Sequence, residues 1–166
     1  MADDKLQQKL VDYIEDTQAL EQNVSRMLDS MISTTEDPEI EEMLRHHKEE
    51  TERQEQRLRE RLDALGAGTS ARKEAQTIAA ALMKGAADQV RGDQAGKNAR
   101  DAYTTEHMEE IAAYQLLERL AERAGDTETA EVARQNRAEE EEMARKIDAN
   151  WDKFLGLTLA ENDIRV

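Results

Sequence analysis

Hydrophobic residues recur at intervals of three and four along most of the chain, which is the spacing of one buried face of an α-helix. The first pattern predicts a helix over about residues 5–33. Its inward positions are Leu10, Ile14, Thr17, Glu21, Val24, Leu28 and Met31. Asp37 and Pro38 are an N-cap and a first helical residue, and they predict the start of a second helix. Its inward positions are Ile40, Met43, Leu44, His47, Glu50 or Thr51, Gln54, Leu58, Leu62 and Leu65, and Gly66 and Gly68 end it.

The second half of the chain repeats this organisation after an alanine-rich segment that predicts a short helix at about 71–90. One long helix follows, with inward positions Ala99, Tyr103, Glu106 or His107, Glu110, Ala113 or Tyr114, Leu117 and Leu120. Gly125 and Asp126 form a C-cap and N-cap pair. The last long helix carries Val132, Ala133, Asn136, Glu140, Met143, Ile147, Trp151 and Phe154. We expect one domain over 1–155 and a short C-terminal tail from Gly156 over 156–166.

These elements predict an all-α protein, because no segment shows the alternation of a strand. The connections within each pair of long helices are a few residues long, so each pair is an antiparallel hairpin. The segment of about 30 residues between the hairpins is long enough to cross the bundle from end to end. We therefore expect a ferritin-like four-helix bundle of two antiparallel hairpins with an additional short crossover helix.

Each long helix carries a glutamate on its inward face, and the four fall at similar heights. Glu21 lies 12 residues before Ser33 and Glu50 lies 12 after Pro38, which places both about 18 Å from the first turn at about 1.5 Å per residue. Glu110 and Glu140 lie about 20–22 Å from the second turn by the same measure. If the two turns lie at opposite ends of the bundle, the four carboxylates meet at its middle.

Four buried carboxylates repel one another and require protons, water, basic partners or cations. His47 precedes Glu50 by three residues, and His107 precedes Glu110 by three, so each imidazole shares a helix face with a glutamate. Oxygen ligands with imidazoles suit Fe or Mn. We therefore expect a dinuclear Fe or Mn site whose ligands are Glu21, His47, Glu50, His107, Glu110 and Glu140. A polar layer that holds water and no metal is the alternative.

Composition narrows the classes of partner. The 166 residues carry a net charge of −15, which disfavours nucleic acid and anionic membrane surfaces. There is no cysteine, so disulfides and thiolate ligands are excluded. The N-terminus lacks the apolar region of a signal peptide, and no stretch approaches a membrane span in length. We expect a cytoplasmic protein whose partners are metal ions or a second copy of itself.

Three segments resemble a known family: "DTQALEQNVSRML" at 16–28, "HKEETERQEQRL" at 47–58 and "EIAAYQLLERLAE" at 110–122. They are similar to the YciE/YciF-type ferritin-like stress proteins, a bacterial family described as a domain of unknown function. The resemblance covers about residues 5–155. It implies a five-helix ferritin-like fold, commonly dimeric, with a di-metal centre related to those of rubrerythrin and manganese catalase.

By motif, the resemblance assigns metal-ligand positions to Glu21, His47, Glu50, Glu110 and Glu140. The chain departs from the family at His107, where the family has glutamate. It departs from ferritins and rubrerythrins at Arg53 and Met143, where those proteins have histidines. The leading hypothesis is a stress-related di-metal protein that acts on peroxide or oxygen or sequesters metal. A non-catalytic structural or interaction dimer with a metal-free polar layer is the second hypothesis, and storage of cations without redox chemistry is the third. Whether the protein is an enzyme stays open.

Overall fold

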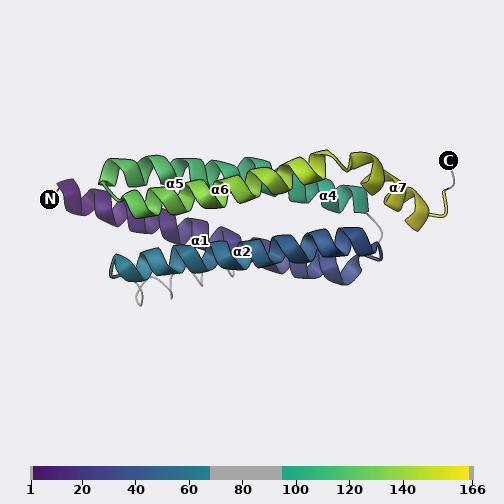
Figure 1. Ribbon diagram of the computed structural model, residues 1–166, viewed down its shortest axis with the longest axis horizontal. Helices are drawn as coiled ribbons and strands as arrows, with labels where there is room; N and C mark the ends of the chain where they lie inside the picture. Colours follow the sequence, from purple (N-terminus) through teal and green to yellow (C-terminus); the bar gives the residue numbers. More distant parts are fainter. Residues whose placement is uncertain (1, 68–94, 165–166) are drawn as a thin grey trace.

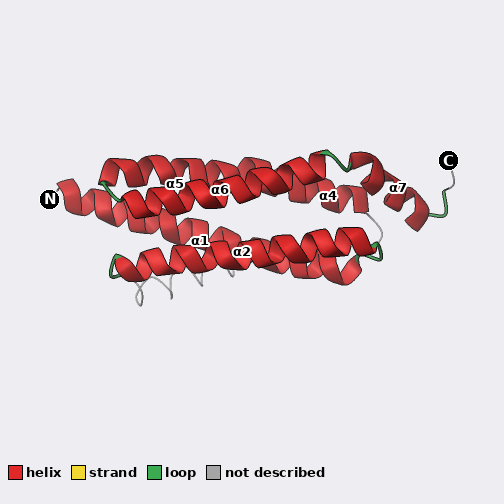
Figure 2. Ribbon diagram, in the orientation of Figure 1, coloured by secondary structure: helices red, strands yellow, loops and turns green. Residues whose placement is uncertain are grey.

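The computed structural model describes residues 2–67 and 95–164, and within these ranges every regular element is a helix (Figure 2). The first half contains α1 (Ala2–Thr34) and α2 (Pro38–Ala64). The second half contains α4 (Ala95–Thr104), a π-helix η1 (Thr105–Glu110), α5 (Ile111–Ala124), α6 (Thr127–Asp148) and α7 (Trp151–Glu161). The prediction of an all-helical protein is confirmed for these residues. The short helix expected at about 71–90 lies outside the described residues.

The long helices pack as a bundle of two hairpins. α1 packs against α2, α5 packs against α6, and the hairpins meet through α1 with α5 and α2 with α6 (Figure 1). The C-terminal end of α2 and the N-terminal end of α4 lie at opposite ends of the bundle (Figure 1).

Local cap chemistry sets the predicted helix boundaries. The Asp37 carboxylate accepts hydrogen bonds from the backbone amides of Glu39 and Ile40, each at 3.0 Å, which satisfies two amides that the first turn leaves without partners. Asp126 caps α6 in the same way through the amide of Thr129 at 3.0 Å. Gly125 ends α5 with a φ of +74°, a conformation that glycine adopts without the steric cost of a side chain.

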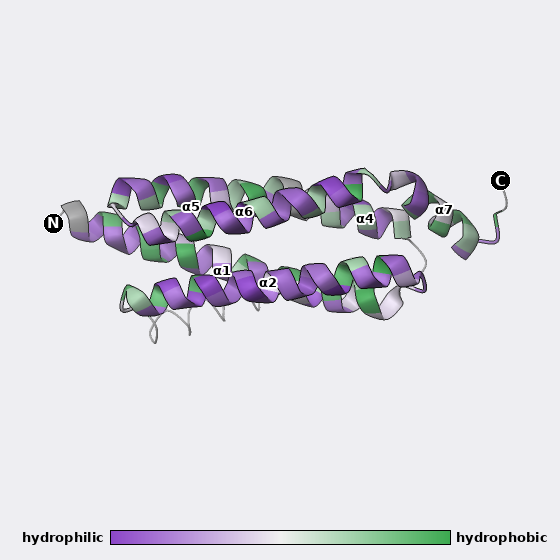
Figure 3. Ribbon diagram, viewed as in Figure 1, coloured by the Kyte–Doolittle hydropathy of each residue, from purple (hydrophilic) through white to green (hydrophobic). Residues whose placement is uncertain are grey.

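The hydrophobic core consists of two clusters with a polar layer between them. The cluster near the loop joining α1 and α2, called here the proximal cluster, contains Val24, Leu28, Met31, Ile40, Leu44, Ala99, Ala102, Met143, Ile147 and Phe154. The distal cluster contains Leu10, Ile14, Leu58, Leu62, Tyr114, Leu117, Ala121, Ala130 and Ala133. The labelled helices each carry both hydrophobic and hydrophilic residues (Figure 3). On α1, α2 and α6, buried polar residues lie between the members of the two clusters; they include Glu21, His47, Gln54, Asn136 and Glu140.

The structure differs from the sequence prediction in two elements. The helix expected over 99–120 is interrupted by η1, whose hydrogen bonds follow a wider spacing than those of an α-helix. Gly156, which was expected to begin the tail, lies inside α7. α7 packs on α4, where the amide of Gly96 donates to the Thr158 hydroxyl at 2.7 Å. This contact, with the buried Phe154, holds the segment against the end of the bundle and extends helical structure past the glycine.

Candidate metal centre

Three buried glutamates meet between the two core clusters. Glu21 comes from α1, Glu110 from the end of η1, and Glu140 from α6. Each offers a carboxylate oxygen that lies within 4.8 Å of the other two, and at most 1% of each residue is exposed. Glu21, Glu110 and Glu140 thus meet in the interior, as their distances along the helices from the two turns predicted. Glu50, the fourth member of the predicted layer, lies outside this group of three.

His47 connects the three-carboxylate group to Glu50. Its Nε2 lies 3.7 Å from a Glu140 oxygen, and its Nδ1 lies 3.6 Å from a Glu50 oxygen. The His47 side chain is 1% exposed and that of Glu50 is 15% exposed. The neighbouring His47 imidazole lowers the pKa of the Glu50 carboxyl and outweighs the opposite effect of burial. Glu50 is thus an ionised carboxylate at the edge of the buried layer.

Tyr114 orients one side of the three-carboxylate group. Its hydroxyl donates a hydrogen bond to Oε1 of Glu21 and accepts one from the Asn136 side chain at 3.0 Å. Burial raises the pKa of the Tyr114 phenol well above its usual value, and the charge of Glu21 raises it further. The phenol therefore keeps its proton and acts as a fixed donor to Glu21.

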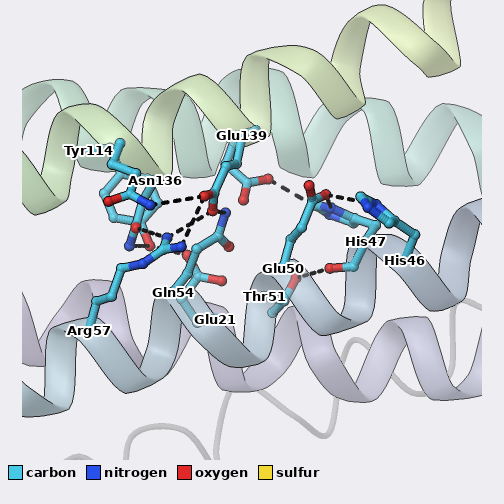
Figure 4. Close-up of polar contacts among 12 residues, drawn as sticks. Glu21, His46, His47, Glu50, Thr51, Gln54, Arg57, Tyr114, Asn136 and Glu139 are labelled. Carbon is cyan, nitrogen blue, oxygen red and sulfur yellow. Dashed lines mark hydrogen bonds and ion pairs between the residues drawn. The ribbon is translucent and has the colours of Figure 1, made fainter.

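An arginine joins this chain of hydrogen bonds to the edge of the bundle. Arg57 donates to Oδ1 of Asn136 at 2.6 Å and to both oxygens of Glu139 at 2.9 and 3.0 Å. Gln54 also donates to Glu139, at 3.0 Å. Figure 4 shows these residues beside the His47 and Glu50 pair. The polar chain runs from the partly exposed Arg57 through Asn136 and Tyr114 to Glu21, so the position of Glu21 is fixed from the side away from His47.

The predicted residues fall into three groups. Glu21, Glu110 and Glu140 meet directly, while His47 and Glu50 adjoin them. The side chain of His107 lies outside the described part of the structure. Its backbone belongs to η1.

The positions at which the chain departs from ferritins take up other roles. Arg53 is exposed, with its guanidinium 4.0 Å from Glu49, and Met143 is a core residue of the proximal cluster. Glu139, the neighbour of Glu140 in the sequence, has a side chain that is only 21% exposed and is hydrogen-bonded to Arg57. Asn136 and Glu139, which accept hydrogen bonds from Arg57, lie within four residues of Glu140 in the sequence. Arg57 itself lies two helical turns after Glu50. This closeness to predicted ligands is the signal by which the sequence could have indicated the hydrogen bonds of Arg57, called here the Arg57 network.

The family model described as "Domain of unknown function (DUF892)" matches residues 5–159. The chain belongs to the DUF892 family. Its fold is similar to that in a crystal structure of a protein from Xanthomonas campestris pv. campestris, with a TM-score of 0.78 at 24% sequence identity over 96% of this chain and 99% of that chain. It is also similar to YcfI from Rhodopseudomonas palustris, with a TM-score of 0.66 at 23% identity over 86% of this chain and 92% of that chain.

At these identities the similarity concerns the fold, so the chemistry of this DUF892 chain rests on its own residues. Three carboxylates and an imidazole form a donor set of hard oxygen and nitrogen atoms, which fits Fe(II) or Mn(II). Within the described part of the chain, no helix is both long and apolar enough to cross a membrane.

Proposed function

We propose that this DUF892 protein is a ferritin-like metal-binding protein that holds iron or manganese in its buried carboxylate layer. The observation that carries the proposal is the approach of the Glu21, Glu110 and Glu140 carboxylates to within 4.8 Å of one another in the interior. Ionised carboxylates at that separation repel strongly at low dielectric constant. A bound divalent cation would reverse this repulsion and use the same oxygen atoms as ligands.

The arrangement also supports a site for two ions. Glu140 belongs to the three-carboxylate group and also lies 3.7 Å from the His47 imidazole. Glu140 could therefore bridge two metal ions, one bound by Glu21 and Glu110 and the other by His47 and Glu50. His107, which precedes Glu110 by three residues in the sequence, is the remaining member of the proposed ligand set. The hydrogen bond from Tyr114 would hold the Glu21 carboxylate in place beside a bound metal.

A stress-related role follows as part of the same proposal. Paired iron or manganese ions exchange electrons with peroxide or dioxygen, and a buried site with one fixed carboxylate per helix favours such chemistry over loose surface binding. The resemblance to YciE/YciF-type proteins supports this reading. Sequestration of metal without turnover would use the same ligands, and measurement of peroxide consumption by the metal-loaded protein distinguishes the two.

Metal titration tests the proposal. We expect the protein purified without chelator to contain Fe or Mn, and the metal-free protein to bind about two equivalents of Mn(II) or of anaerobic Fe(II) per chain. The double variant Glu21→Gln and Glu110→Gln should lose this binding. The matched control, Glu141→Gln and Glu142→Gln, removes the same charge from side chains that are 42% and 52% exposed, and it should bind as the wild type does.

The structural alternative also has an observation in its favour. YcfI of Rhodopseudomonas palustris is described as a proposed structural protein, and a buried polar layer between two apolar clusters can fix the register of helices. In that case the chain would act as a metal-free helical dimer. A protein that binds neither metal, and whose Tm is unaffected by both, would support this alternative and contradict the metal proposal.

A further inference from the structure

A cavity of about 40 Å³ lies in the proximal cluster, between the loop that joins α1 and α2 and the packed pair of α4 and α7. Its buried wall is formed by Ile40, Leu44, Ala99, Ala102, Met143, Ile147 and Phe154. The polar residues that line it, Thr34, Thr35, Asn98 and Glu161, are partly or fully exposed. The cavity is therefore apolar on its inner side and polar toward solvent.

The inner wall lies one helical turn from the candidate metal centre. Leu44 precedes His47 by three residues on α2, and Met143 follows Glu140 by three on α6. Residues at this spacing share a helix face, and one turn is about 5 Å along the axis. The same two helices thus carry both the cavity and the His47 and Glu140 pair, in register, along the interior of the bundle.

The apolar side chains of the inner wall favour a molecule that forms no hydrogen bonds. Water in a protein interior needs two to four polar partners, and the buried wall residues named above have apolar side chains. The nearby Thr34 hydroxyl is already directed at the carbonyls of Ser30 and Met31, at 3.1 and 3.2 Å. A volume of about 40 Å³ exceeds the roughly 10–15 Å³ that one water requires. A small uncharged molecule that makes no hydrogen bonds fits both the apolar wall and the volume of the cavity.

We propose that this cavity binds one molecule of dioxygen and supplies it to the metal centre. The binding step rests on the cavity alone, whereas the supply step rests on the proposed function. Iron held by these ligands would supply the electrons: two Fe(II) ions would each lose one electron, and dioxygen would take up both with two protons from solvent to form hydrogen peroxide. Leu44 and Met143, which separate the cavity from the His47 and Glu140 pair, are apolar and offer polar oxidants no hydrogen-bond partner.

The methionines of the chain provide the test of binding in metal-free protein. Met31, Met43 and Met143 line the cavity, whereas Met108 is 68% exposed. Dissolved dioxygen is paramagnetic and shortens the relaxation times of nearby methyl nuclei in protein labelled with ¹³C-methyl methionine. We expect the Met143 methyl, which is 1% exposed, to relax faster under oxygen pressure than the Met108 methyl. Relaxation that instead follows exposure, with Met108 fastest, would overturn the proposal.

Filling the cavity separates binding from supply. Ala102→Val adds two methyl groups to the wall and should reduce the oxygen effect on Met143, while Ala133→Val in the distal cluster should not. In Fe(II)-loaded protein, the rate of oxidation by dioxygen should fall in Ala102→Val in proportion to the loss at Met143. An oxidation rate equal to that of Ala133→Val would overturn the supply step. Because the relaxation test uses metal-free protein, failure of metal binding leaves its result unaffected.

Discussion

Replacing Glu110 with glutamine should stabilise the metal-free protein, although most changes at a fully buried residue destabilise. Glu110 has 0% exposed surface, and its carboxylate lies within 4.8 Å of the oxygen atoms of Glu21 and Glu140. Glutamine keeps the size of the side chain and removes the charge. The change therefore tests whether repulsion among the three carboxylates costs folding free energy when no cation is bound.

The magnitude follows from the geometry. Two ionised carboxylates 4.8 Å apart repel by about 3.5 kcal/mol at an effective dielectric constant of about 20, and Glu110 has two such neighbours. Proton uptake limits the cost, since protonating a glutamate of ordinary pKa at pH 7 costs about 4 kcal/mol. We expect Glu110→Gln to raise the free energy of unfolding by about 2–4 kcal/mol, which corresponds to about 5–15 °C in Tm for a chain of this length.

The assay is urea and thermal unfolding at pH 7 in the presence of a chelator. Glu142→Gln, which removes one charge from a 52% exposed side chain, is the matched control and should change stability by less than about 0.5 kcal/mol. With Mn(II) in place of the chelator, the order should reverse, because only the wild type gains the free energy of binding. A metal-free Glu110→Gln variant less stable than the wild type would refute the reasoning, since it would mean that the surroundings favour the carboxylate.

Three further predictions concern the scaffold. The hydrogen bond from the Ile40 amide and then the charge of Lys153 lower the pKa of Asp37, so its stabilising effect is present at neutral pH and is lost as the pH falls. Asp37→Ala should therefore lower the free energy of unfolding by about 1 kcal/mol at neutral pH. This difference from the wild type should narrow below about pH 4. In urea unfolding, Gly125→Ala should destabilise the protein by about 1 kcal/mol, because Gly125 has a φ of +74°. Gly156→Ala should stabilise it by about 0.5–1 kcal/mol, because Gly156 lies inside α7 with open space around it. Arg57→Ala should cost about 1–3 kcal/mol in the same assay, because it breaks the paired hydrogen bonds to Glu139.

Each of these has its own control. Asp37→Asn keeps an oxygen for the cap and removes the titration, so its stability should not show the acid-dependent narrowing. Arg53→Ala removes an exposed arginine 4.0 Å from Glu49 and should change stability by less than about 0.5 kcal/mol. A loss for Arg53→Ala as large as that for Arg57→Ala would contradict the assignment of the Arg57 network as a specific interior contact. Equal effects of alanine at the two glycines would contradict the backbone argument.

The sequence by itself determined, for the described residues, most of the helices, the caps at their ends and most of the inward positions. Asp37, Pro38, Gly125 and Asp126 act through hydrogen bonds and dihedral angles within a few residues of themselves, so their effects are local. The inward position of Glu21 followed from helical periodicity in the same way. These features depend on one helix at a time, which is why the spacing of residues was sufficient to predict them.

Tertiary structure decided how the helices meet and which side chains face one another. The π-helix that ends at Glu110 changes the angular spacing of the residues on it, and no local pattern in the sequence indicated it. Glu139 and Glu140 are neighbours about 100° apart around a helix of 3.6 residues per turn, so the rotation of α6 in the bundle assigns one to Arg57 and the other to the buried centre. That rotation is fixed by the packing of all the helices together, because each must bury its apolar face at once.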